Sequence, residues 1–135
     1  MALEIPRSNF RFIERNFSDL ILEIRDGVGG ILGGVRSIRK TIVFQDTSKL
    51  YCIEELDSNG EFIELYWYDW YDHDKSLIMK FHAHYHKDGT PPQITMYDPF
   101  HIHLRNQSRI TNTAHRELDS ILEFIRLRHH SMKNS

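Results

Sequence analysis

Apolar residues change their spacing twice along this chain, and that change limits the folds that the sequence can adopt. Between residues 38 and 86, apolar and polar side chains alternate with a period of two, as in a strand with one buried face. Towards the two ends of the chain, apolar residues recur at every third or fourth position, as along one face of a helix. The pattern predicts an antiparallel sheet between two helices, because only short turns separate the strand-like runs.

The two helical patterns lie towards the ends of the chain. The first predicts a helix over residues 9–26, with Ser8 as its N-terminal cap and Gly27 at its C-terminal end. Its apolar stripe consists of Phe10, Ile13, Phe17, Leu20, Ile21 and Ile24. The second follows Asn112 or Thr113 as cap, and its apolar face consists of Ala114, Leu118, Ile121, Leu122 and Ile125. We expect both apolar faces to pack on the sheet.

Six runs rich in β-branched and aromatic residues are typical of strands. They cover residues 38–44, 50–56, 61–71, 76–86, 93–97 and 100–105. Asn59-Gly60 predicts a tight hairpin, because both residues tolerate a positive φ. The glycine-rich segment 27–34 predicts a connection rather than a phosphate-binding loop, because Val35-Arg36 follows where Lys and Ser or Thr are needed. The expected fold class is α+β, an antiparallel β-meander of about five to six strands packed against an N-terminal and a C-terminal helix.

Length and composition fit one α+β domain over residues 1–135. The chain has 135 residues, of which 40% are hydrophobic, so it can bury a core and is not expected to be disordered. Its single cysteine, Cys52, cannot close an intrachain disulfide, which favours a reducing compartment. Its apolar runs are shorter than the roughly 18 residues of a membrane span. We therefore expect a cytoplasmic protein that does not insert into a membrane.

Charge is distributed unevenly along the chain. Residues 46–74 contain one basic residue, Lys49, and nine acidic ones, whereas residues 75–135 contain nine basic and five acidic ones. The second segment also contains eight of the nine histidines. Such a distribution can steer an anionic partner to one side of a fold. Composition alone favours the simpler interpretation, which is ordinary solvated charge.

Two short segments place histidines on one side of neighbouring strands. In residues 76–86, the side chains expected to face the core are Leu77, Met79, Phe81, Ala83 and Tyr85, and those expected to face away are Lys80, His82, His84 and His86. In residues 100–105, the corresponding sets are Phe100, Ile102 and Leu104, and His101, His103 and Arg105. Because the pKa of an ordinary imidazole is about 6.5, such a surface can take up and release protons at neutral pH.

Three functions can use this arrangement. Two imidazoles and a cation can cleave RNA, one imidazole removing the 2′-hydroxyl proton and another protonating the leaving oxygen. A His-x-His pair can instead bind a metal ion, with a third ligand from His101, His103 or Asp98. The third possibility is a polar face covered by solvent or a protein partner. Because neither pair has a carboxylate or cysteine at ligand spacing, the sequence favours catalysis without metal and predicts no cofactor.

Further basic residues are candidates for contacts with RNA phosphates. They are Arg36, Arg39, Lys40 and Lys80. Contacts of this kind hold and orient a nucleic acid without reading its sequence. For the first three, a solvated strand surface is an equally good interpretation.

The segment YWYDWYDHDKSLIMKFHAHYH, followed by YDPFHIHLRN and the helical LDSILEFI, resembles the TumE-type toxin family of prokaryotic toxin–antitoxin systems. The resemblance covers about residues 64–126 and consists of an aromatic strand, a turn with Asp, a Leu-Ile strand, histidine-rich segments and a C-terminal helix. It implies catalytic roles for His86, His101 and His103, with Arg105 beside them. His82 and His84 are added to this catalytic set by their own spacing.

The resemblance also implies what the protein does and with which partners. It implies a small toxin, a ribonuclease acting on an RNA substrate, that is neutralised by a cognate antitoxin with a helix-turn-helix domain. The sequence does not decide whether the protein also forms a homodimer. The alternatives are a histidine-rich metal-binding protein and a non-catalytic protein-interaction module.

Overall fold

One antiparallel sheet accounts for most of the structure, a computed structural model that describes residues 3–87 and 89–133. Its strands are β1 (Ile5–Pro6), β2 (Ile21–Asp26), β3 (Ser37–Phe44), β4 (Lys49–Leu56), β5 (Phe62–Tyr71), β6 (Leu77–Ala83), β7 (Phe100–Leu104) and β8 (Arg109–Thr111). The helices are α1 (Phe10–Asn16), α2 (Pro92–Thr95) and α3 (Leu118–Lys133). The strands lie in the order β2-β3-β4-β5-β6-β7-β8, and β1 pairs with β5. The antiparallel meander is confirmed, with more strands than the predicted five to six.

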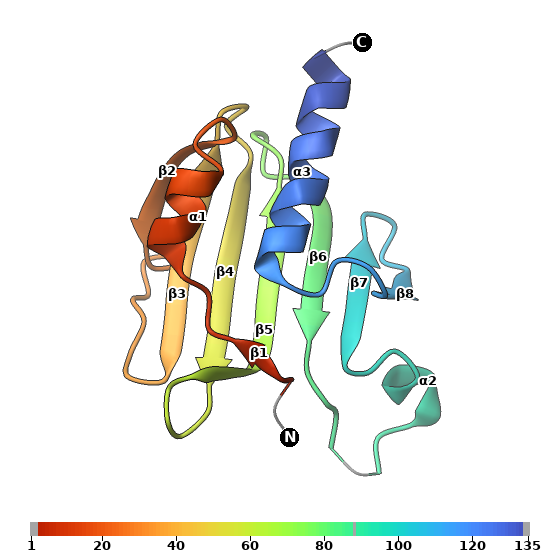
Figure 1. Cartoon of the computed structure of the whole chain (residues 1–135). Helices are drawn as coiled ribbons and strands as arrows, with labels where there is room; N and C mark the ends of the chain where they lie inside the picture. The colour runs from red at the N-terminus through yellow and green to blue at the C-terminus, as the bar shows by residue number, and fades with distance from the viewer. Residues whose placement is uncertain (1–2, 88, 134–135) are drawn as a thin grey trace.

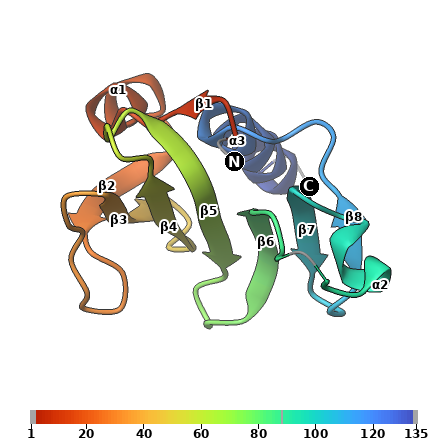
Figure 2. The same ribbon diagram turned by 90° about the horizontal axis from the view of Figure 1, so that it is seen from below.

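Helices cover one face of this sheet. Figures 1 and 2 show α1 and α3 on the same side, with the opposite side, called the open face below, free of both helices. The core between the helices and the sheet includes Ile13 of α1, Phe17 directly after it, and Ile121, Leu122 and Ile125 of α3. The predicted packing of both apolar stripes on the sheet is therefore correct for these residues. No helix in the described part of the chain combines the length and apolar character that crossing a membrane requires.

The central strands alternate between the two faces as predicted. In β4, Leu50, Cys52 and Leu56 are buried, whereas Tyr51 and Ile53 are half-buried on the open face. The predicted hairpin at Asn59-Gly60 joins β4 to β5, with Gly60 at a φ of 70°. The period of two therefore fixes which side chains enter the core and which line the open face.

The first predicted helix is wrong in its second half. The helix expected over residues 9–26 ends at Asn16, and Ile21–Asp26 form the edge strand β2, with Ile24 opposite Ile42 of β3. Spacings of three and four residues suit a helix, but here they also suit a short helix followed by a turn and a strand. Backbone pairing with β3 decides between them, which tertiary contacts often do against local pattern.

The predicted helix ends also differ from the structure. Asn9 caps α1 by accepting a hydrogen bond from the Phe12 backbone N–H, whereas Ser8 donates to Glu54. Gly27, at a φ of 89°, follows β2 and opens the connection to β3. The C-terminal helix begins at Leu118, so Ala114 lies before it, and Asn112 bonds the backbone of His115 in the preceding turn.

Two predictions in the second half of the sheet are wrong as well. Residues 93–97 were expected as a strand, but Pro92–Thr95 form α2, which proline favours because it fits the first turn of a helix. The strand expected to reach residue 86 ends at Ala83, so Tyr85 is 46% exposed instead of facing the core. The strand β8, only three residues long, is too short to show a period in the sequence.

A buried carboxylate fastens the N-terminal segment to the sheet. Glu54 of β4 is fully buried and accepts hydrogen bonds from the Tyr68 hydroxyl at 2.6 Å and from the backbone N–H of Ser8 at 3.1 Å. The Ser8 hydroxyl donates to the same carboxylate. Burial and the neighbouring Glu54 raise the pKa of Tyr68, so the phenol stays protonated and donates. The carboxylate is tolerated in the core because these donors satisfy it.

Removing one of these donors should destabilise the protein. We expect Tyr68→Phe to lower the free energy of unfolding by about 1.5–3 kcal/mol, because the buried carboxylate loses a hydrogen bond. Tyr51→Phe on the open face is the matched control and should change it by less than about 0.5 kcal/mol. Urea denaturation of the three proteins measures both values. Equal changes in the two variants would contradict this role of Glu54.

Candidate histidine site

The pairing of β6 with β7 brings the predicted histidines together. His82 of β6 lies opposite His101 of β7, and Lys80 lies opposite His103. Between them, Phe81 and Ile102 face each other on the core side of the sheet. Because side chains alternate along a strand, the histidines all extend from the open face.

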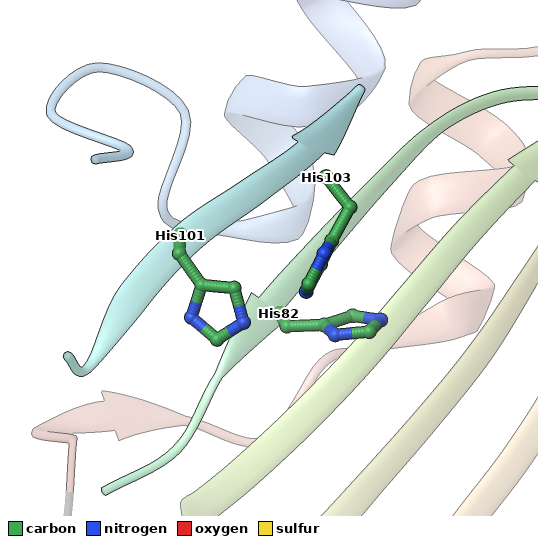
Figure 3. A group of neighbouring side chains, drawn as sticks. All are labelled: His82, His101 and His103. Atoms are coloured by element: carbon green, nitrogen blue, oxygen red, sulfur yellow. The ribbon is translucent and has the colours of Figure 1, made fainter. Parts of the chain in front are cut away.

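Three of these imidazoles form a compact cluster. Ring centroids are separated by 4.7 Å between His82 and His103, 4.8 Å between His101 and His103, and 5.5 Å between His82 and His101. One ring nitrogen of each histidine lies within 4.8 Å of the other two. Figure 3 shows one nitrogen of each ring facing the space between the rings. The three ring nitrogens are therefore close enough to contact the same ion or the same substrate group.

A carboxylate on the next strand orients one of the three rings. Asp69 of β5 lies 2.8 Å from Nε2 of His82, measured from its Oδ1. Since an ionised carboxylate only accepts hydrogen bonds, His82 donates through Nε2 and turns its Nδ1 towards the cluster. His82, His101, His103 and Asp69 are called the histidine site below.

The other two predicted histidines extend the row beyond the end of β6. The ring of His84 lies 5.2 Å from that of His101 and 4.5 Å from that of His86. His86 is held by Asp98, with 2.6 Å between Nδ1 and Oδ1 and a backbone hydrogen bond of 2.9 Å. All five histidines predicted as catalytic are therefore in a continuous series of ring contacts, and a carboxylate binds a histidine at each end.

His101 is the most enclosed member of the series. It is 3% exposed, and its buried Nδ1 has no hydrogen-bond partner among the residues that the structure describes. Burial is the main cause that lowers the pKa of His101 to about 3 and that of His103 to about 4, and the charges of neighbouring histidines and Arg109 add to it. Both imidazoles are therefore neutral at pH 7 and can accept a proton.

Besides Lys80, the cation placed beside this cluster is Arg109, which the sequence analysis did not name. Arg105 lies in the turn after β7, where its Nε donates to the backbone oxygen of Leu77 at 2.8 Å. Arg109 of β8 lies directly opposite His103. Arg109 was missed because β8 is short, although Arg109 and Thr111 flank Ile110 with the period of a strand.

Asp69 was also missed, although the sequence carries a signal for it. It shares its face with Trp67 and Tyr71 in the aromatic strand, and its register partner on β6 is Lys80. Alternation in both strands predicts that Asp69 and His82 lie on the same face. The contact itself depends on the register of the β5–β6 pair, which contains an irregularity at its turn end.

The other predicted RNA-binding residues lie at a different place on the sheet. Lys80 adjoins the histidine site, whereas Arg39 and Lys40 belong to β3. In the sheet, β3 is the third strand away from β6, which at about 4.8 Å per strand is a distance of about 14 Å. Each of the three distant cations contacts a carboxylate. The ion pairs are Arg36–Glu64, Arg39–Glu55 and Lys40–Asp26. The structure therefore does not bring these three residues together with the histidines.

Comparison with known proteins gives one match. A family model described as toxin TumE matches residues 9–129, most of the chain. Neither a curated protein nor a solved structure matches. The family resemblance predicted from residues 64–126 is confirmed, and the matched segment contains every residue of the histidine site.

The low pKa values predict how stability depends on pH. Since the pKa of His101 is about 3 in the folded protein against an ordinary 6.5, the unfolded chain binds more protons between these values. Above about pH 6.5, His101 is neutral in both states and costs no stability. As the pH falls towards the folded pKa, protonation of the unfolded chain lowers the free energy of unfolding. Between pH 7 and pH 5, His101 alone should lower the free energy of unfolding by about 2 kcal/mol.

Urea denaturation at the two pH values measures this effect. We expect His101→Gln to reduce the loss of stability on acidification, because glutamine does not titrate. His130→Ala, an exposed position on α3, is the control and should lose as much stability as the unsubstituted protein. If all three proteins showed the same loss, burial of a neutral His101 would be contradicted.

Proposed function

The chain belongs to the toxin TumE family, and from this premise we propose that it cleaves RNA at the histidine site by proton transfer between imidazoles. The family consists of toxins, so the coarse function is that of the toxin in a toxin–antitoxin system, with a cognate antitoxin as its partner. Ribonuclease activity, the histidine mechanism and a helix-turn-helix domain in the antitoxin are parts of the proposal.

The observation that supports this chemistry best is the meeting of three ring nitrogens within 4.8 Å. In the proposed reaction, an imidazole takes the proton of a ribose 2′-hydroxyl, whose oxygen then bonds to the adjacent phosphorus. The bond from phosphorus to the 5′-oxygen breaks, and a second imidazole gives that oxygen a proton. The products are a 2′,3′-cyclic phosphate and a 5′-hydroxyl, and no metal ion takes part.

Different surroundings suit the histidines to different roles. His101 and His103 are neutral at pH 7, so each keeps a lone pair that can accept the 2′-hydroxyl proton, although their low pKa makes them weaker bases than an ordinary imidazole. His82 is held by Asp69 through Nε2, which orients the ring and leaves Nδ1 as the nitrogen that we assign to the proton donor. The pair of His86 with Asp98 resembles that arrangement and supports a second donor beside His84.

Cations and aromatic rings around the site suit an RNA substrate. Lys80 and Arg109 both lie opposite His103, from the strands on its two sides, and are proposed to stabilise the negative charge that develops at phosphorus. Trp67 lies on the same face, with its ring 6.4 Å from that of His84, and offers a surface for a stacked base. We propose that Arg36 and Arg39 contact phosphates further along the RNA, whereas Lys40 pairs with the buried Cys52 and so extends from the helix-covered face.

Substitution of the central histidines tests this proposal. Total RNA is incubated at neutral pH, in the presence of a chelator, with the purified protein and with His101→Ala and His103→Ala. We expect the unsubstituted protein to cleave and each variant to lose on the order of 10²–10⁴ in rate. His130→Ala should retain full activity. Intact RNA with the unsubstituted protein, or variants as active as it, would contradict the catalytic function.

A comparison of two arginines tests which cation serves the reaction. We expect Arg109→Ala to lower kcat by about 10²-fold, in the range seen when a group that stabilises the transition state is removed. Arg105→Ala should have an effect at least tenfold smaller, because its Nε is engaged by Leu77. Initial cleavage rates at saturating RNA give both values. The reverse order would assign the phosphate charge to Arg105, as the sequence suggested.

A further inference from the structure

The histidine site also has the donor arrangement of a metal centre. Two adjacent strands supply three imidazoles, and one nitrogen of each lies within 4.8 Å of the other two. In a tetrahedral zinc site, with bonds of about 2.0–2.1 Å, ligand nitrogens are about 3.4 Å apart. The three nitrogens are at most 4.8 Å apart, so binding an ion would require them to approach by up to about 1.4 Å, and Figure 3 shows them facing one another.

Asp69 supplies the outer contact that metal-binding histidines commonly have. A histidine that ligates a metal usually donates its other ring N–H to a carboxylate or carbonyl oxygen. Nε2 of His82 lies 2.8 Å from the Asp69 carboxylate, which leaves Nδ1 for an ion. The carboxylate also places one negative charge beside the three neutral ligands.

His101 offers its Nε2 to the cluster, since Figure 3 shows this nitrogen towards His82 and His103 and Nδ1 on the far side of the ring. His101 is 3% exposed, and its buried Nδ1 has no hydrogen-bond partner among the residues described here. The ring is therefore not fixed by a hydrogen bond from that nitrogen and can adjust to an ion.

The donor set selects one class of ion. Three imidazoles without oxygen ligands suit Zn²⁺ and similar transition-metal ions rather than Mg²⁺ or Ca²⁺, which prefer oxygen. Three protein ligands also leave a fourth position open. Lys80 and Arg109 beside His103 repel a cation, so the affinity should be lower than in a three-histidine site without such neighbours.

We propose that His82, His101 and His103 bind one Zn²⁺ ion and that the bound ion inhibits RNA cleavage. Inhibition follows because coordination occupies the nitrogen lone pairs that move protons in the reaction. This second half rests on the function proposed above, whereas metal binding does not. The toxin would thus be active in its metal-free form and silenced by an available transition-metal ion.

Zinc binding is tested without reference to activity. The full chain is treated with chelator, dialysed and titrated with Zn²⁺ in competition with a chromophoric chelator. We expect one ion per chain, and a loss of affinity of at least about 10-fold in His82→Ala, His101→Ala, His103→Ala and Asp69→Asn. His130→Ala is the matched control and should bind as the unsubstituted protein does.

A second measurement guards against loss of folding in the variants. Co²⁺ bound to the unsubstituted protein should give the visible absorption of a tetrahedral site, and added Zn²⁺ should displace it. Circular dichroism shows which variants remain folded. Absence of binding, or binding unchanged in folded variants of the three histidines, would overturn the proposal.

Cleavage assays separate the two halves. Cleavage in chelator, with inhibition by Zn²⁺ at the concentration where Zn²⁺ binds, supports both. Zinc that binds without slowing cleavage overturns the inhibitory half alone. Cleavage that requires Zn²⁺ overturns both inhibition and the metal-free mechanism, while the metal site stands. If RNA is never cleaved, the proposed function and the inhibition fail, and the titration alone decides on the site.

Discussion

The site depends on the register between β6 and β7. Phe81 and Ile102 face each other on the core side of this pair, and their burial against the helices fixes how the two strands align. With that alignment, His82 lies opposite His101 on the other side. A shift of one residue would move the imidazoles into the core and the apolar side chains to the open face. The apolar packing of Phe81 and Ile102 on one face therefore positions the histidines on the other.

Crowding makes the histidines of this face unlike one another. Within the three-histidine cluster, burial and neighbouring positive charge keep His101 and His103 neutral. At the two ends, Asp69 and Asp98 hold His82 and His86 through hydrogen bonds of 2.8 and 2.6 Å. Proton transfer needs an acceptor and a donor that differ in this way, whereas a metal ion needs neutral nitrogens held at close spacing. The same arrangement satisfies both requirements, which is why we propose that they compete.

The sequence predicted the centre of this arrangement better than its surroundings. Alternation along two neighbouring strands is sufficient to predict that His82, His101 and His103 share a face, because successive side chains of a strand point to opposite faces. Alternation does not predict side-chain positions beyond the end of a strand. Arg105 follows the last residue of β7, whereas Arg109 lies opposite His103 and belongs to a strand too short to recognise in the sequence. The N-terminal helix was overextended for a related reason, since spacing alone does not show which backbone groups pair across a sheet.

The chemical nature of the cleaved ends tests the central claim most directly. If imidazoles activate the 2′-hydroxyl, RNA cut in the presence of a chelator carries a 2′,3′-cyclic phosphate on one fragment and a 5′-hydroxyl on the other. A single 2′-deoxy substitution at the cleaved position then blocks the cut. Fragments that end in a 3′-hydroxyl and a 5′-phosphate, or cleavage that survives the 2′-deoxy substitution, would contradict the account, because water rather than the 2′-hydroxyl would be the nucleophile.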